Sequence, residues 1–306
     1  MKFIVFEPSR IIFASFHWYG MKRLVLFFSL IVFIVLVQAC RKSAVPSYLY
    51  VPAFDFEVLS NQGTSSNNFT EVWMYKDEQP LGVFALPALI PVIHEGDADI
   101  KFFAGIKNNG ISDTRIRYPF ITAFDTTLNF ISGNTDTIVP HFKYDDLCTI
   151  EQQGFESGNF LVELAGNGGV FSAVTEDNLV FEGNRSGMGL LTSGSGKIYF
   201  KDDTNRDFTG GQMYFLEMNY SCNNKMSVGL LVTEASGITK ELALIVNPTQ
   251  SADGIPIWKK IYVDFGAIPQ KHSQALFYEW YVESIPDAPN KAVEVYLDNL
   301  KWVKWQ

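Results

Sequence analysis

The stretch FYEWYVES, residues 277–284, decides the fold class because large side chains alternate along it. In a β-strand, successive side chains point to opposite faces, so the even-numbered residues from Tyr278 to Val282 would share one face and the odd-numbered residues the other. Comparable segments separated by turn residues follow one another through the second half of the chain, namely QMYFLEMNYSC (212–222), MSVGLLVTE (226–234) and KELALIVN (240–247). Short strands at this spacing predict an all-β sandwich or jelly roll.

The composition of the whole chain agrees with packed sheets. Of its 306 residues, 47% are hydrophobic and 15% aromatic, but only 19% are charged, and the length suffices for about two domains. The first 39 residues hold four basic residues and one acidic residue, which leaves 20 basic and 32 acidic residues in the remainder. This net negative charge opposes attraction to phosphate backbones, so nucleic acid is not an expected partner.

The first half of the chain also consists of short apolar segments, beginning with LYVPAFDFEVL (49–59). In EVWMYKDEQPLGVFAL (71–86), the Asp77-Glu78 pair followed by Pro80 separates two apolar segments, which predicts a β-hairpin. The stretch from Val72 to Phe103 resembles the small sandwich domains called PEGA or carboxypeptidase-regulatory-like domains. Turn residues in 131–146 mark a boundary, so we expect an N-terminal β-sandwich at residues 46–140 and a C-terminal jelly roll at residues 147–306.

The N-terminal region predicts export from the cytoplasm. MKRLVLFFSLIVFIVLVQAC (21–40) has two positive charges, an apolar run from Leu24 to Val37 and a small residue before Cys40, as in a secretory signal peptide. A membrane-spanning helix needs about 20 apolar residues, so a retained anchor is the weaker interpretation. Residues 1–20 fit neither a signal peptide nor a domain, and we expect the true start at Met21 within a signal region of residues 1–39.

The stretch Leu36-Val37-Gln38-Ala39-Cys40 resembles the bacterial lipobox, whose cysteine is lipidated before signal peptidase II cuts in front of it. The resemblance implies a lipoprotein held through Cys40 at a membrane, expected to be the outer membrane, with residues 40–45 as the tether. The residues that follow Cys40 are compatible with either face of the outer membrane, the periplasmic face or the face exposed at the cell surface. The alternative is that a general signal peptidase cuts after Ala39.

Three short motifs of the second half are GFESG (154–158), EGNRSG (182–187) and VYLDNL (295–300), and together they resemble jelly-roll carbohydrate-binding modules of the galactose-binding type. In such modules a structural calcium ion often ties the first strand to the last, and the matching oxygen ligands here are Glu156 and Asp298. Calcium is therefore the candidate cofactor. The alternative is that Glu156 is simply exposed and Asp298 caps a turn or accepts backbone hydrogen bonds.

Besides Cys40, the chain contains two cysteines, Cys148 and Cys222. In an oxidising compartment they could form one disulfide, which would stabilise the fold by roughly 4 kcal/mol if their Cα atoms lie about 4.4–6.8 Å apart. Two buried free thiols are the alternative.

Sugar binding requires exposed aromatic rings flanked by polar groups, and the candidate ligand platform comprises Asn184, Arg185, Trp258, Tyr278 and Trp280. Aromatic residues at alternating strand positions also form cores, which is the competing interpretation. The sequence contains no Gly-x-Ser-x-Gly motif, no phosphate-binding glycine loop and no closely spaced histidine pair. Catalytic residues are therefore not expected, and we predict that the protein is not an enzyme.

Three functional hypotheses follow from these patterns. The first is a non-catalytic binding or scaffold subunit associated with an outer-membrane protein complex, which fits a lipid anchor, two β-domains and the lack of catalytic motifs. The second is a glycan-binding lipoprotein that uses its jelly roll. The third is a polysaccharide-active enzyme, which rests on fold analogy alone, because jelly rolls host many functions.

Overall fold

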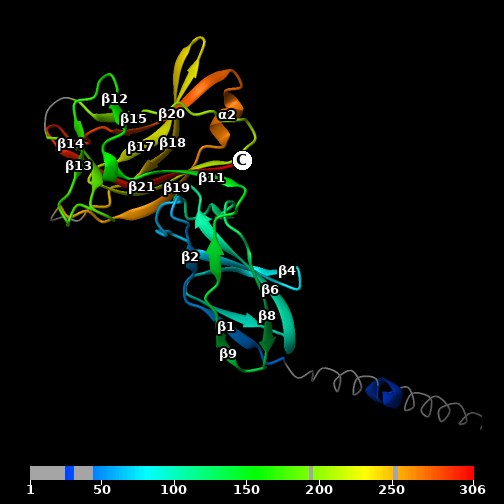
Figure 1. Ribbon diagram of the computed structural model, residues 1–306. Coiled ribbons are helices and arrows are strands. Elements are labelled where there is room, and N and C mark those ends of the chain that lie inside the picture. Colours follow the sequence, from blue (N-terminus) through cyan, green and yellow to red (C-terminus); the bar gives the residue numbers. More distant parts are fainter. Residues whose placement is uncertain (1–24, 31–43, 193–195, 251–253) are drawn as a thin grey trace, which may run out of the picture. The chain divides into compact units, whose positions relative to one another are not determined.

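A computed structural model of the protein describes residues 25–30, 44–192, 196–250 and 254–306. The chain divides into two units, Met1–Pro46 and Ser47–Gln306, and the second contains the strands described below (Figure 1). In the first unit, residues 25–30 are helical, whereas Cys40 and most of the expected signal peptide lie outside the described residues. Within the described ranges, no helix combines the length and the apolar character needed to span a membrane.

The second unit begins with an N-terminal lobe, defined as residues 47–147, which is built from three small sheets. The strand orders are β5-β1-β9, β10-β2 and β4-β3-β6-β7, with β8 also paired to β6. The strands of this lobe are β1 (Ser47–Val51), β2 (Asp55–Glu57), β3 (Glu71–Lys76), β4 (Gln79–Ala85), β5 (Ala88–Val92), β6 (Gly96–Lys107), β7 (Arg115–Arg117), β8 (Phe124–Phe130), β9 (Thr135–Thr137) and β10 (His141–Lys143).

The hairpin predicted around Asp77-Glu78 is confirmed. Strands β3 and β4 pair antiparallel with Lys76 opposite Gln79, so Asp77 and Glu78 alone form the turn. Both have positive φ angles, 48° and 62°, as a two-residue hairpin turn of this kind requires. The backbone N–H of Asp99 donates to Asp77 Oδ1 at 3.1 Å, which helps to hold this turn, in which Glu78 occupies the position that usually has glycine.

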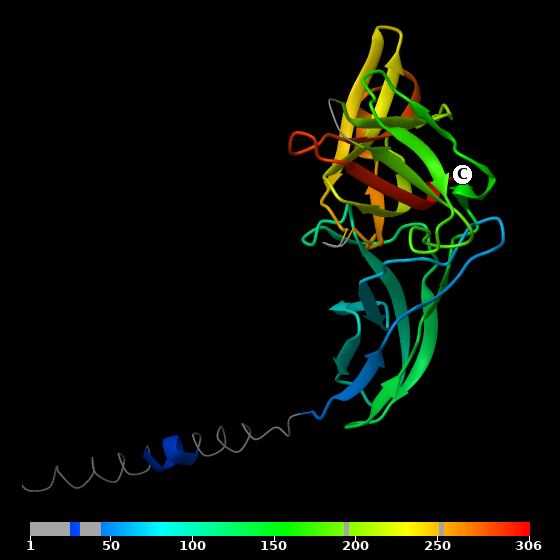
Figure 2. The same cartoon turned by 90° about the vertical axis from the view of Figure 1, so that its left-hand side faces the viewer.

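The C-terminal lobe, residues 148–306, is a sandwich of two antiparallel sheets that lie face to face (Figure 2). One sheet, the junction sheet, has the order β13-β14-β21-β16-β19, with β11 also paired to β21; the other, the outer sheet, has the order β12-β15-β20-β17-β18. The elements of this lobe are β11 (Cys148–Gln153), the 3-10 helix η1 (Phe155–Ser157), β12 (Leu161–Glu163), β13 (Val170–Val174), β14 (Ser186–Leu191), β15 (Ile198–Asp202), β16 (Tyr214–Cys222), β17 (Met226–Glu234), β18 (Gly237–Val246), β19 (Lys259–Asp264), α2 (Ala267–Lys271), β20 (Ala275–Ser284) and β21 (Val293–Trp305). The all-β prediction, with a β-sandwich followed by a jelly roll, is confirmed.

Each lobe has a hydrophobic core of its own, and the two cores meet at the junction sheet. The inner face of that sheet packs against the outer sheet. From its opposite face, Phe215, Tyr262 and Val303 enter the core of the N-terminal lobe, where Phe215 lies 5.8 Å from the Phe120 ring and Tyr262 4.9 Å from the Tyr118 ring. The N-terminal lobe therefore covers part of the C-terminal lobe with aromatic side chains.

A buried polar network lies within this junction and centres on Glu217 of β16. The hydroxyls of Tyr118 and Tyr144 donate to Glu217 Oε1 at 2.6 and 2.7 Å, and Lys260 Nζ lies 3.0 Å from Glu217 Oε2. Burial alone would raise the pKa of Glu217, but Lys260, Lys301 and the tyrosine donors outweigh it and lower that pKa. Burial also lowers the pKa of Lys301 to about 8. Lysines of the C-terminal lobe thus neutralise one buried carboxylate, to which tyrosines of the N-terminal lobe donate hydrogen bonds.

Candidate functional site

The second unit contains a cavity of about 680 Å³, to which both lobes contribute, and we call it the Trp258 cavity. Its wall comes from a loop before β3, the end of β6 and the turn after it, the loop before β14, and strands β16, β18 and β19. The lining residues are Ser66, Asn67, Asn68, Lys107, Asn109, Gly110, Phe181, Asn219, Tyr220, Ile245, Val246, Asn247, Trp258, Lys259, Lys260, Ile261 and Tyr262.

The apolar side of the Trp258 cavity is aromatic. Trp258 directly precedes β19 and is partly exposed, and its ring centroid lies 5.4 Å from that of Phe181. The Tyr296 ring of the junction sheet, outside the lining, lies 6.2 Å from Trp258. Tyr220 of β16 and Tyr262 of β19 add two more rings to the lining. The indole is therefore held in place by other rings while part of it faces solvent.

The polar side of the Trp258 cavity is rich in amides that are held by backbone groups. Asn68 Nδ2 donates to the carbonyl of Lys260 at 3.1 Å, and the Asn68 backbone N–H donates to the Tyr262 hydroxyl at 2.9 Å. Asn109 Oδ1 accepts from the backbone N–H of Asp264 at 2.8 Å. Such anchored amides are fixed before any ligand arrives, which lowers the entropic cost of binding.

Cationic groups complete the lining. Lys260 forms an ion pair with Glu217, whereas Lys107 and Lys259 form no ion pair with another described residue. Among the described residues that line the cavity, none has a carboxylate side chain. The cavity thus offers rings, amides and ammonium groups to a ligand.

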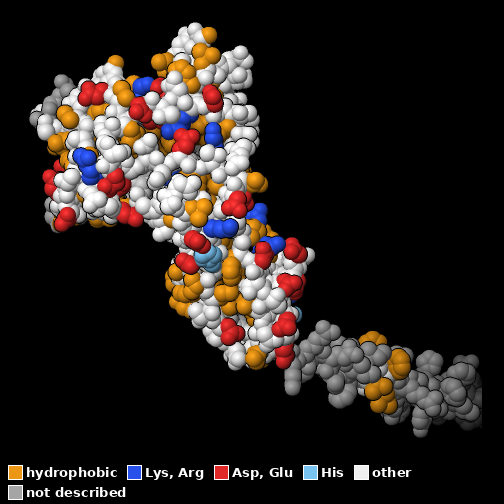
Figure 3. Space-filling model, in the orientation of Figure 1, with side chains coloured by type: hydrophobic (Ala, Val, Ile, Leu, Met, Phe, Trp, Pro, Cys, Tyr) orange, Lys and Arg blue, Asp and Glu red, His pale blue; other side chains and the backbone are white. Residues whose placement is uncertain are grey.

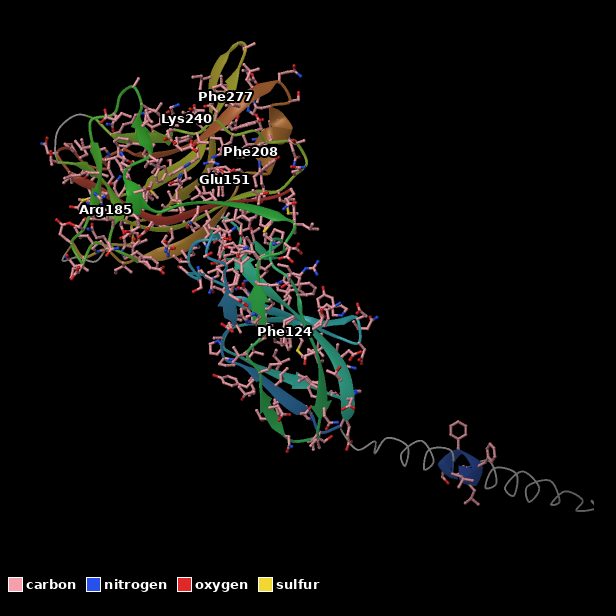
Figure 4. The ribbon with its side chains drawn as sticks, viewed as in Figure 1. Phe124, Glu151, Arg185, Phe208, Lys240 and Phe277 are labelled. Carbon is pink, nitrogen blue, oxygen red and sulfur yellow. The ribbon has the colours of Figure 1, made fainter. Side chains whose placement is uncertain are left out.

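Of the predicted platform residues, Trp258 lies in this cavity, but Tyr278 and Trp280 do not. Tyr278 and Trp280 are 2% and 1% exposed and belong to the core of the C-terminal lobe, so their assignment as platform residues was wrong. The other face of β20 carries Glu279 and Glu283. Glu283 pairs with Lys197 and Lys240 at 2.5 Å each, and Glu279 pairs with Lys201, so this charged face points outward. Phe277 and Lys240, labelled in Figure 4, belong to the outward face.

Asn184 and Arg185 lie in the loop before β14 and do not line the Trp258 cavity. Figure 4 shows Arg185 away from Phe277. Their backbone N–H groups donate to Glu156 Oε1 at 2.7 and 3.0 Å. Asn184 and Glu156 line another cavity, of about 520 Å³, at the junction of η1, this loop and β21. The structure therefore separates these two residues from Trp258.

The predicted calcium ligands Glu156 and Asp298 both line this smaller cavity. The backbone hydrogen bond from Asn184 is the main cause that lowers the pKa of Glu156, and burial raises that of Asp298. Asp298 Oδ2 accepts from Ser186 Oγ at 2.5 Å, and its Oδ1 accepts from the backbone N–H of Asn299 at 2.7 Å. Within the described residues, no group of three or more His, Cys, Asp or Glu side chains is arranged to hold a metal ion. Calcium binding stays a prediction that rests on the resemblance alone.

The disulfide predicted between Cys148 and Cys222 is wrong, because both are free thiols. Along β21, Cys148 lies opposite Trp305 and Cys222 lies opposite Val295. At about 3.3 Å per residue, these positions are some 30 Å apart, far beyond the roughly 4.4–6.8 Å between Cα atoms that a disulfide spans. The thiols instead contact the carbonyls of Phe120 and Asn247, at 3.9 and 3.6 Å.

Mass spectrometry under non-reducing conditions should therefore find Cys148 and Cys222 both reduced in the folded protein. Burial raises the pKa of each thiol to about 11, so neither is a ready nucleophile. We expect iodoacetamide to label Cys222 only after unfolding, and dithiothreitol to leave the melting temperature unchanged. A cross-linked peptide pair that survives in the absence of reductant would contradict this assignment.

Sequence reasoning missed the part of the site that comes from the N-terminal lobe. Asn68 belongs to the stretch SSNN (65–68), and Lys107 and Asn109 belong to KNNG (107–110). Both stretches resemble ordinary turns. The one available signal was the presence of paired asparagines in two loops of the same lobe, and nothing in the sequence connects those loops to Trp258.

No protein-family model matches the chain, and no curated protein matches it. Solved structures with some similarity include the adhesin domain of Lys-gingipain from Porphyromonas gingivalis W83, at 13% identity and a TM-score of 0.36, over 50% of this chain and 97% of that one. A mutant family 29 carbohydrate-binding module has 17% identity and a TM-score of 0.33, over 51% and 85% of the two chains. A carbohydrate-binding module of the β-sandwich superfamily has 14% identity and a TM-score of 0.33, over 86% and 99%. The chain is thus similar, at low identity, to solved structures that include carbohydrate-binding β-sandwich modules.

Proposed function

We propose that the protein is a non-catalytic glycan-binding protein and that the Trp258 cavity is its ligand site. The observation that carries the proposal is a partly exposed indole, in ring contact with Phe181 and Tyr296, that lines the same cavity of about 680 Å³ as anchored asparagine amides. A sugar ring has an apolar C–H face and a polar edge of hydroxyl groups. An aromatic ring opposite amide donors and acceptors complements both sides of such a ligand.

The charges of the lining narrow the ligand class. Lys107 and Lys259 give the cavity a positive character, which favours glycans with acidic sugar units. Glycoside hydrolysis usually needs two carboxyl groups about 5–9 Å apart, whereas the described lining supplies amides, ammonium groups and rings. These groups suit binding without bond cleavage.

The Trp258→Ala variant should bind glycan at least ten-fold more weakly than the wild type, because it loses the ring against which the sugar stacks. The measurement is isothermal titration with uronic acid-containing and neutral oligosaccharides, chosen by a prior glycan array. The matched control is Phe277→Ala, which removes a partly exposed ring outside the cavity and should leave affinity unchanged. If no array glycan binds, or if Trp258→Ala binds as tightly as the wild type, the cavity is not a sugar site.

The proposed place of work is the outer membrane, with the chain anchored by lipid on Cys40. The lipobox-like residues 36–40 support this, since several acyl chains together give stable attachment. Cells fed alkyne-palmitate should label the wild-type protein, whereas Cys40→Ala should accumulate as an unlabelled precursor. If the wild-type protein stayed unlabelled and fractionated with soluble proteins, the proposed lipid anchor would be excluded, but the proposed glycan site would not be affected.

Docking on an outer-membrane protein complex is the second candidate function. Its support is the edge strand β18, where Ile238, Leu242 and Ile245 are 66%, 51% and 53% exposed. Figure 3 shows hydrophobic side chains at the tip of the lobe, where the β17–β18 hairpin lies. Exposed apolar edges are common sites of protein association. In-cell crosslinking that recovers the same partner from the wild type and from Leu242→Lys would argue against this surface.

A further inference from the structure

The sheet β4-β3-β6-β7 of the N-terminal lobe has aromatic side chains on the face that points away from its core. Val72, Met74 and Phe102 point inward and are fully buried. Alternation places Trp73 and Tyr75 of β3 on the opposite face, and both are partly exposed. Phe103 of β6, which lies opposite Trp73, is also partly exposed, and these three rings define what we call the Trp73 face.

Two rings of the Trp73 face, Tyr75 and Phe103, are in contact, and Trp73 is the cross-strand neighbour of Phe103. The Tyr75 and Phe103 ring centroids are 5.5 Å apart, and the guanidinium carbon of Arg117 lies 4.6 Å above the Phe103 ring. The indole of Trp73 lies against Gly105, where a Cβ would come within 2.9 Å of Trp73 Nε1. Glycine at position 105 therefore leaves room for the indole beside the backbone. The fixed rings lose little conformational entropy when a ligand covers them.

Polar groups surround these rings and are balanced in charge. Lys101 lies 3.4 Å from Glu78 and 3.5 Å from Asp125, and Arg115 lies 3.2 Å from the buried Glu71. The Trp73 Nε1 atom is buried and has no hydrogen-bond partner among the described residues. This N–H group faces the Gly105 backbone, so a ligand would contact the ring of Trp73 rather than its nitrogen.

This mixture of rings and charges fits a polysaccharide better than a protein partner. The core of a protein interface is enriched in aromatic residues and arginine but depleted of lysine and acidic residues, whereas here Lys101 and its partners Glu78 and Asp125 lie beside the rings. A sugar polymer has a hydroxyl group on almost every carbon, so it can satisfy the charged groups while its C–H faces cover the rings. The balanced charge also favours a neutral polymer.

We propose that the Trp73 face is a second glycan-binding surface, which binds an extended neutral polysaccharide across β3 and β6. It differs from the Trp258 cavity because it is an open sheet face on which Lys101 and Arg115 form ion pairs, whereas the cavity is a hollow in which Lys107 and Lys259 form no ion pair with another described residue. The inference does not depend on the cavity.

The test is affinity electrophoresis of the wild type, Trp73→Ala, Trp258→Ala and the double variant in gels that contain soluble xylan, β-mannan or hydroxyethyl cellulose. The proposal expects Trp73→Ala to lose at least ten-fold in affinity for one of these polymers, both alone and in the Trp258→Ala background. Leu89→Ala, which removes a 56% exposed side chain from another sheet of the same lobe, should migrate like the wild type. A polymer that retards Trp73→Ala as much as the wild type in both backgrounds, or no retardation of any protein, would overturn the proposal.

A second measurement keeps the test sound if Trp73→Ala is poorly folded. The indole N–H resonance of Trp73, assigned with Trp73→Phe, should shift when the retarding polymer is added to the wild type, and Phe103→Ala should weaken that shift. If only the cavity variant loses binding and the Trp73 resonance stays in place, the glycan-binding function stands and the Trp73 face is not part of it. Selective loss of a protein crosslink in Trp73→Ala, with polymer binding intact, would instead assign the face to a protein partner.

Discussion

Replacing Glu217 by alanine should lower the free energy of unfolding by about 3–5 kcal/mol, as expected when one partner of a buried ion pair is removed. The variant leaves Lys260 buried without its counter-charge, and it removes the acceptor for the hydroxyls of Tyr118 and Tyr144. Urea unfolding followed by tryptophan fluorescence measures the loss. For a domain of this size, each kcal/mol corresponds to about 2–4 °C in melting temperature.

Two further variants show whether the charge of Glu217 is the cause. Glu217→Gln keeps an acceptor for the tyrosines but lacks the charge, so it should recover only part of the stability. Glu163→Ala removes an exposed carboxylate of β12 and should change the free energy of unfolding by about 0.5 kcal/mol or less. Near-wild-type stability of Glu217→Ala would mean that solvent reaches the junction and that the network does not hold the lobes together.

Trp280→Ala should destabilise the C-terminal lobe by about 3–5 kcal/mol, in the range measured for large core residues. Trp280 is 1% exposed, lies opposite Leu230 on β17 and is surrounded by the core between the two sheets. Removing its indole leaves a void that the two sheets can close only in part. The measurement is again denaturant unfolding, with the slope of the transition checked to confirm that the folded and unfolded states are comparable.

Trp258→Ala is the informative comparison for Trp280→Ala. It deletes the same side chain from a partly exposed position, so it should cost less stability while weakening glycan binding. The opposite pattern, in which Trp258→Ala unfolds the protein and Trp280→Ala impairs only binding, would exchange the core and ligand roles that the structure gives to the two tryptophans.

The fold class could be predicted from the sequence because alternation is a local property. The stretch 277–284 shows period two without any tertiary information, and it does form β20. Which of its two faces packs into the core could not be predicted, since both carry large aromatic residues and both are buried from Tyr278 to Ser284. That choice depends on Lys197, Lys201 and Lys240, which lie on neighbouring strands and pair with the glutamates of β20. Such ion pairs between neighbouring strands cannot be inferred from the sequence of one strand alone.

The candidate site could be predicted only in part, for a similar reason. Trp258 was identified because an exposed tryptophan next to polar residues suits a ligand platform. The asparagines of the N-terminal lobe that face it are about 150–190 residues away along the chain. The disulfide prediction was wrong for the same reason. A spacing of 73 intervening residues is compatible with a disulfide, and only the register on β21 excludes it.

The way the N-terminal lobe covers Phe215, Tyr262 and Val303 has a consequence for the history of the gene. A truncated chain that begins at Cys148 would expose these three side chains to solvent, together with Glu217 and Lys301. Such a fragment would tend to aggregate. Recombination could not easily move the jelly roll into another protein by itself, so the two halves are expected to be inherited together.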